Sequence, residues 1–158
     1  MDMIKRRASD RRCQLLHLRV GWTALLLFAT LGTLLELLHA FKVPWYLGVA
    51  SESRRLMWTL GHAHGTALGL VNLALAAVCH LLPRPVPGAA SASLVAGTIL
   101  IPGGFFAGGL FVHGGDPGLG VVLVPPGALL VLAALALIVR ASLAPDGGAA
   151  PSGDERRG

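Results

Sequence analysis

The chain has 158 residues, of which 54% are apolar and only 13% are charged, and its formal net charge is +5. A typical soluble domain carries roughly 25% charged residues, so this composition excludes an ordinary water-soluble protein. The mean hydropathy of +0.68 agrees with that conclusion. No stacking aromatic residues alternate with the basic ones, which argues against nucleic acid as a partner. We therefore predict an integral membrane protein.

Four apolar segments are long enough to cross a bilayer, because a hydrocarbon core about 30 Å thick needs about 20 helical residues. They cover residues 20–41, 56–82, 91–112 and 118–139. The first segment is longer than the apolar region of a signal peptide and lacks a small-residue cleavage site, so we expect a retained helix. Since the connections are short, the prediction is an all-α, four-helix membrane bundle in which sequential helices are antiparallel neighbours.

The chain is predicted to form a single domain, residues 1–143. Residues 144–158 consist of Ala, Pro, Gly, Ser and charged residues, a composition typical of a disordered tail. Residues 42–55 form the longest expected loop, in which Trp45 and Tyr46 are typical of anchors at the membrane interface.

Two proline-containing patterns concern the last helix. Asp116-Pro117 predicts its start, because Asp accepts free N–H groups at a helix cap and Pro fits the first helical position. Pro125-Pro126-Gly127 then predicts a kink near its middle.

Small residues recur at helical spacing in the second and third segments. Gly61, Gly65 and Gly69 follow each other at intervals of four, and Gly104 and Gly108 repeat the spacing. Such stripes allow helix backbones to approach closely in membranes. We expect them to pack within one bundle; a dimer interface is the alternative.

The basic residues predict the orientation. Cytoplasmic loops of membrane proteins are enriched in Lys and Arg, so ten of the thirteen should lie inside and three outside. The ten are Lys5, Arg6, Arg7, Arg11, Arg12, Arg19, Arg84, Arg140, Arg156 and Arg157, and the three are Lys42, Arg54 and Arg55. Both termini are therefore predicted to be cytoplasmic. The composition, rich in Ala, Leu, Gly and Arg, favours a multi-pass protein of a bacterial inner membrane.

Six titratable side chains are expected near the outer leaflet, where charged groups in a membrane are usually paired or functional. They are Glu36, His39, His62, His64, His113 and Asp116. Successive helical residues differ by about 100°, so His62 and His64 point about 160° apart and only one can face a given site. We assign His62 to the site. His64, which shares a stripe with Asn72, is assigned to a neighbouring helix or the interface.

Imidazole and carboxylate groups together suit a transition metal. The candidate ligands are Glu36, His39, His62 and His113. Glu36-x-x-His39 has the Glu-x-x-His spacing used in di-iron helical bundles. Such a site needs two of these motifs and two further Glu, and the chain has no other intramembrane Glu, so a di-iron centre is not expected. A single transition metal or a haem remains open, as does a Glu/His proton relay. The simplest alternative is that a histidine across a helix interface neutralises Glu36.

The two cysteines are expected on the cytoplasmic side. Cys13 precedes His17 by one turn, and Cys79 is followed by His80. The reducing compartment gives no reason to expect a disulfide. A soft-metal site is one interpretation; the other makes Cys79 a small packing residue and His80 an interfacial one.

Helix two carries one resemblance to a known family. The segment His62-Ala63-His64-Gly65-Thr66-Ala67-Leu68-Gly69 is similar to the His-x-x-Gly-x-x-Asn-Gly segment of the four-helix membrane isomerases of the hydroxylaminobenzene mutase and styrene oxide isomerase type. The resemblance covers this segment and the four-helix layout, with Leu68 in place of the motif's Asn. It implies that His62 binds a haem, whose iron acts as a Lewis acid on a small apolar substrate. The chain equally resembles small bacterial inner-membrane proteins without a known function.

Two functional interpretations follow, and they leave open whether the protein is an enzyme. In the first, the bundle is structural or binds a partner: lipid, another membrane protein or a second copy. In the second, it is a small membrane enzyme or redox module that uses His62 to hold a metal or haem. The sequence slightly favours the first.

Overall fold

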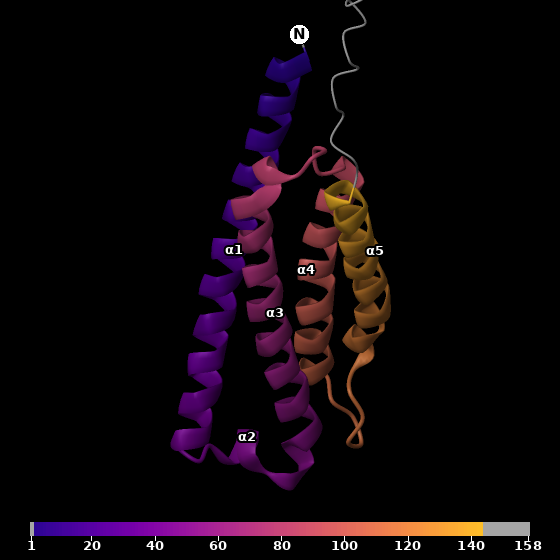
Figure 1. The fold of residues 1–158 in the computed structure, drawn as a ribbon. Helices are drawn as coiled ribbons and strands as arrows, with labels where there is room; N and C mark the ends of the chain where they lie inside the picture. Colours follow the sequence, from indigo (N-terminus) through magenta and orange to yellow (C-terminus); the bar gives the residue numbers. More distant parts are fainter. Residues whose placement is uncertain (1, 144–158) are drawn as a thin grey trace, which may run out of the picture.

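The computed structural model describes residues 2–143 and is entirely helical apart from its connections. The predicted tail, 144–158, lies outside the described residues. The elements in chain order are α1 (Asp2–Ala40), α2 (Pro44–Leu47), η1 (Val49–Ser51), α3 (Glu52–Val78), η2 (Cys79–Leu81), α4 (Gly88–Leu110), η3 (Leu119–Leu123) and α5 (Val124–Ser142). Four helical segments are long and apolar enough to span a membrane, which confirms the all-α membrane class (Figure 1).

Helix α1 begins much earlier than the expected segment 20–41. Its 39 residues correspond to about 58 Å at 1.5 Å per residue, well beyond a hydrocarbon core of about 30 Å. The basic tail continues the helix because neither Pro nor Gly occurs before Gly21. Arg6 ties this extension down by donating a hydrogen bond of 2.8 Å to the carbonyl oxygen of Leu82, beyond α3.

The start of the last helix also differs from expectation. Asp116 does not cap it: His113 and Asp116 exchange backbone hydrogen bonds of 3.1 and 3.0 Å in a tight link with Gly114 and Gly115 at positive φ. A 3-10 turn follows, and α5 starts only at Val124, with proline in its first turn. The expected mid-helix kink was therefore wrong. The prolines lie in the first turn of α5, where backbone N–H groups have no carbonyl partner within the helix. The missing N–H of proline therefore costs no backbone hydrogen bond there.

The segment predicted as a 42–55 loop contains the short helix α2 and an aromatic cluster. Trp58 of α3 lies at its centre, with ring centroids 5.6 Å from Trp45, 6.4 Å from Tyr46 and 5.6 Å from Phe106 of α4. The indole of Trp58 also donates a 3.1 Å hydrogen bond to the Phe106 carbonyl. Tyr46 is thus a buried core residue and not an interfacial anchor, while Trp45 remains exposed.

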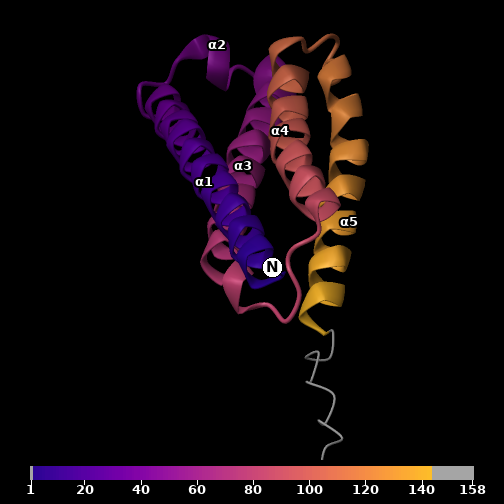
Figure 2. The same ribbon diagram turned by 90° about the horizontal axis from the view of Figure 1, so that it is seen from above.

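The packing follows chain order: α1 lies on α3, α3 on α4, and α4 on α5. Figure 2 shows α1 and α5 at opposite sides of the molecule. Glycines make these contacts close. A Cβ built on Gly69 would lie 3.3 Å from the Gly21 carbonyl oxygen of α1, and one on Gly104 would lie 3.0 Å from the Gly120 carbonyl oxygen. Gly61 faces the Pro102 carbonyl of α4 in the same way. The prediction that these stripes pack inside the bundle is confirmed.

Candidate functional site

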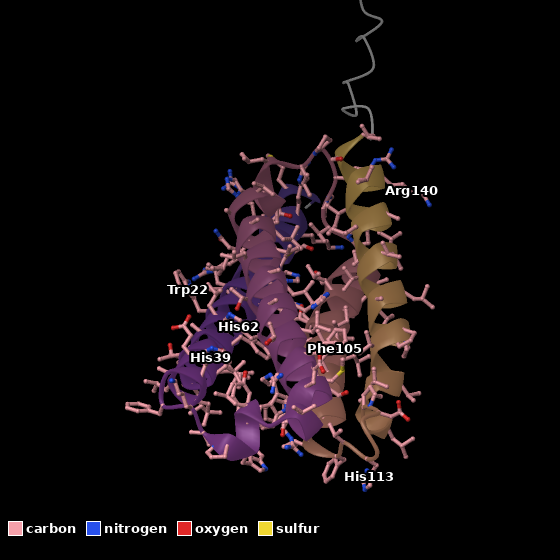
Figure 3. All side chains as sticks on the ribbon, turned by 90° about the horizontal axis from the view of Figure 1, so that it is seen from below. Trp22, His39, His62, Phe105, His113 and Arg140 are labelled. Atoms are coloured by element: carbon pink, nitrogen blue, oxygen red, sulfur yellow. The ribbon has the colours of Figure 1, made fainter. Side chains whose placement is uncertain are left out.

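The expected outer group of titratable side chains does not gather. Glu36, His39, His113 and Asp116 are all exposed. Figure 3 places His113 in the link between α4 and α5, away from His39 and His62. Within residues 2–143, no three His, Cys, Asp or Glu side chains form a group that could hold a metal ion. The proposed ligand set of Glu36, His39, His62 and His113 therefore receives no support from the geometry.

Glu36 lies one turn before the end of α1. The described residues contain one ion pair, between Arg6 and Asp10, so the expected pairing of Glu36 with a histidine is not seen. Its exposed position near the helix end lets the carboxylate reach the membrane interface, which lowers the cost of its charge.

His62 is half-buried and lies between α3 and α1. Its Nδ1 lies 2.6 Å from the carbonyl oxygen of Phe28, to which it donates a hydrogen bond. The imidazole occupies the space that a side chain at Gly32 would need, since a Cβ there would overlap the ring. His62 thus joins two helices through a glycine notch.

His64 points elsewhere, as the angular argument predicts. It is exposed, its Nδ1 lies 2.8 Å from the Leu60 carbonyl oxygen of its own helix, and its ring centroid lies 5.1 Å from that of Phe105 in α4. It borders an apolar groove formed with residues of α4 and α5, among them Ile101 and Val131. His64 therefore contacts the neighbouring helix α4, which is one of the two positions that the sequence predicted for this side chain.

The buried polar chemistry lies at the other end of the bundle, in a cluster we call the His17 network. It consists of His17 in α1, Asn72 in α3, and Ser91 and Thr98 in α4, all buried. His17 Nδ1 lies 2.7 Å from Asn72 Oδ1, and His17 Nε2 lies 3.0 Å from Ser91 Oγ. The Asn72 amide nitrogen donates to the Thr98 hydroxyl at 2.9 Å and to the Leu68 carbonyl at 2.8 Å. Three helices are therefore joined through one histidine and one asparagine.

The donors and acceptors of the His17 network balance when the imidazole is neutral. Asn72 Oδ1 is an acceptor, so His17 Nδ1 carries the proton. Nε2 is then free to accept the hydroxyl proton of Ser91. Thr98 accepts from Asn72 and donates to the Leu94 carbonyl at 2.8 Å. The described neighbours satisfy each of these groups, as a low-dielectric environment requires.

Of the two cysteines, Cys13 borders this network. Cys13 lies one turn before His17, and its sulfur is 3.9 Å from Ser91 Oγ. Cys79 is buried, and Cys13 packs against the apolar cluster that contains it. This agrees with the interpretation of Cys79 as a packing residue, and His80 is exposed.

The contact between the cysteines predicts a cross-link. Cys13 is among the groups nearest the Cys79 thiol, although 66 residues separate them in the chain. We expect a mild oxidant to form a disulfide between Cys13 and Cys79 in the detergent-solubilised protein. This disulfide would link α1 to the end of α3. Mass spectrometry of proteolytic peptides, compared before and after reduction, detects the disulfide-linked pair, and Cys13→Ser is the control. Only intermolecular disulfides would contradict the packing of α1 on α3.

Sequence reasoning missed the partnership of His17 with Asn72. Asn72 was noted only as a neighbour on the stripe of His64, and His17 only with Cys13. The available signal was that Asn72, Ser91 and Thr98 are polar residues inside apolar segments, which in a membrane must find partners. Comparison of the chain with protein-family models, characterised proteins and solved structures gives no match.

Proposed function

We propose that this protein is a multi-pass component of a bacterial inner membrane with both termini in the cytoplasm and sequential helices antiparallel. The distribution of Lys and Arg supports this orientation. It is further supported by Figure 1, in which the start of α1, the connection between α3 and α4 and the end of α5 lie at one end of the bundle. Contacts of Arg6 with Leu82 and of Cys79 with the Asp10 carbonyl support the pairing of opposite helix ends.

Its function, we infer, is structural: a non-enzymatic bundle that holds a partner protein in the membrane. The observation that carries this proposal is the His17 network. Four buried polar side chains, His17, Asn72, Ser91 and Thr98, bond one another across α1, α3 and α4, and their hydrogen-bonding capacity is used within the bundle. Groups bonded in this way specify helix packing, and within the His17 network they leave no free nucleophile or base for a substrate.

Helix α5 is the best candidate for the partner-binding surface. It buries only Gly127, Ala134 and Ala141, which are seven residues apart and form one narrow stripe. Leu129 and Leu132 on its remaining surface are 67% and 63% exposed. A helix with one small-residue seam and a broad free apolar surface is suited to a second helix from a partner or from another copy.

Photo-cross-linking in intact cells tests the partner. We expect a photoreactive amino acid at Leu129 or Leu132 to give one discrete protein adduct, and the same group at Leu26 of α1, which is similarly exposed, to give none. An adduct joining two differently tagged copies would identify a homo-oligomer. Adducts with lipid alone at all three positions would exclude this surface as a binding site.

Metal analysis tests the absence of an enzyme centre at His62. We expect the protein, assayed in membranes and after purification, to carry no stoichiometric iron, zinc or copper and no haem absorption. The reason is that, among residues 2–143, His62 belongs to no group of three His, Cys, Asp or Glu side chains that could hold a metal ion. His62→Ala and the exposed control His80→Ala should match the wild type. Stoichiometric iron or a haem spectrum lost only in His62→Ala would contradict the structural proposal and support the isomerase resemblance.

A further inference from the structure

An apolar groove lies between α1 and α4, and Arg19 is among the residues that line it. The groove has a volume of about 430 Å³, within the range of roughly 300–1,000 Å³ that is usual for small-molecule sites. It is partly open to the surroundings of the bundle, and its lining includes Arg19 and Thr23 of α1 and Thr98 and Gly103 of α4. It lies apart from the outer histidines and from the partner-binding surface proposed for α5.

The shape of the groove follows from the packing of its two helices. Near the cytoplasmic end, His17 of α1 bonds Ser91 of α4, and this bridge closes one end. Arg19 and Thr23 follow on α1 at a spacing that puts them on the same face, one turn apart. On α4, Gly103 leaves the far part empty: a Cβ built there meets no atom within 4 Å. The surface of the groove is thus almost entirely apolar, and Arg19 and Thr23 are among the residues that line it.

Arg19 has no partner in the described residues. It is exposed and forms no hydrogen bond or ion pair with residues 2–143. Among the described residues, the lining of the groove contains no Asp or Glu that could serve as a counter-ion, and the neutral hydroxyl of Thr98 is already bonded to Leu94 and Asn72. An arginine at the edge of a hydrocarbon core reaches for the headgroup region, where anionic lipid phosphates are the available anions.

We propose that the groove binds one anionic glycerophospholipid, with an acyl chain between α1 and α4 and the phosphate at Arg19 and Thr23. Charge complementarity favours this occupant over a partner helix. A helix laid on the groove would cover Arg19 without supplying an anion, which is costly in a membrane. A lipid supplies the anion and a thin, flexible chain together, and arginine presents several donors in a fork that matches a phosphate.

Native mass spectrometry of the full-length protein tests the proposal. The protein is equilibrated with equal amounts of phosphatidylglycerol and phosphatidylethanolamine with identical acyl chains, and the lipid retained after delipidation is counted. We expect one phosphatidylglycerol to be retained in preference to phosphatidylethanolamine. Arg19→Gln should reduce the preference about fivefold, as expected for one cation near an anionic surface. Arg140→Gln, at the far side on α5 (Figure 3), should retain it.

Gly103→Leu tests the acyl-chain part separately. Because space is open at this position, the leucine should fill the groove without disturbing the fold, and retention of both lipids should fall. Melting temperatures equal to the wild type identify folded variants. Wild type that shows no headgroup preference overturns the proposal, as does unchanged retention in folded Gly103→Leu. If Gly103→Leu displaced a bound protein or a second copy, and not lipid, the groove would bind a helix, and this result would also overturn the proposal.

Discussion

We expect Asn72→Leu to lower the free energy of unfolding by about 1–3 kcal/mol, the usual cost of leaving buried polar groups without partners. Leucine is similar in size to asparagine, so the effect should come from chemistry and not from a cavity. The substitution removes the acceptor for His17 Nδ1 and the donor to Thr98. Unfolding by SDS in mixed micelles, followed by far-ultraviolet circular dichroism, measures the change.

Two comparisons isolate the His17 network in this experiment. Thr33→Ala, which removes an exposed hydroxyl bonded to its own helix at the Ala29 carbonyl, should change stability little. In a double-mutant cycle of His17→Leu with Asn72→Leu, we expect a coupling of about 0.6 kcal/mol and at most about 1.7 kcal/mol, the range found for hydrogen bonds between membrane helices. Strictly additive losses would show that the two side chains do not interact.

The second large effect is expected for Gly69→Leu at the contact of α3 with α1. A Cβ at Gly69 would already lie 3.2 Å from the Ala24 Cβ and 3.3 Å from the Leu25 backbone nitrogen. Atoms beyond Cβ must force the two helix backbones apart. Because overpacking a tight core typically costs about 1–3 kcal/mol, we expect a loss of about 3 kcal/mol or more, or failure to accumulate in the membrane.

Gly103→Leu is the matched control for this substitution. It adds the same side chain to a glycine in another membrane-spanning helix, but into open space. Replacing a helical glycine gains up to about 1 kcal/mol of helix propensity, so this variant should be as stable as the wild type or slightly more stable. Equal destabilisation of both variants would contradict the close approach of α1 and α3 at Gly69. Denaturation in the same mixed micelles compares them directly.

The four membrane-spanning helices were predicted correctly, because hydropathy and length alone decide them. Apolar segments of sufficient length have one stable solution in a bilayer, so four helices follow from the sequence. Their ends were less predictable, because they depend on local geometry. Residues 2–19 extend α1 although they are basic, and Pro125 begins a helix that it was expected to bend.

The candidate site was only partly predictable, since it depends on which helix faces meet. The 100° rotation between residues correctly separated His62 from His64, a property of one helix. The positions of Glu36, His39 and His113 depend on relations between helices, and these side chains were predicted to converge but remain exposed and apart. The pairing of His17 with Asn72 and Ser91 was not predicted, because these partners lie 55 and 74 residues away in the chain.

The sequence by itself therefore determined the membrane class, the four spans and the glycine stripes that let them pack, because length, hydropathy and helical periodicity are local properties. Only the tertiary structure decided how the polar side chains are used. The rotation and pairing of helices bring His17 to Asn72 and Ser91, leave Glu36 at the surface, and open a groove beside Arg19. These outcomes depend on contacts between segments that are distant in the chain. A small rotation of one helix would turn a polar side chain away from its buried partner and toward lipid.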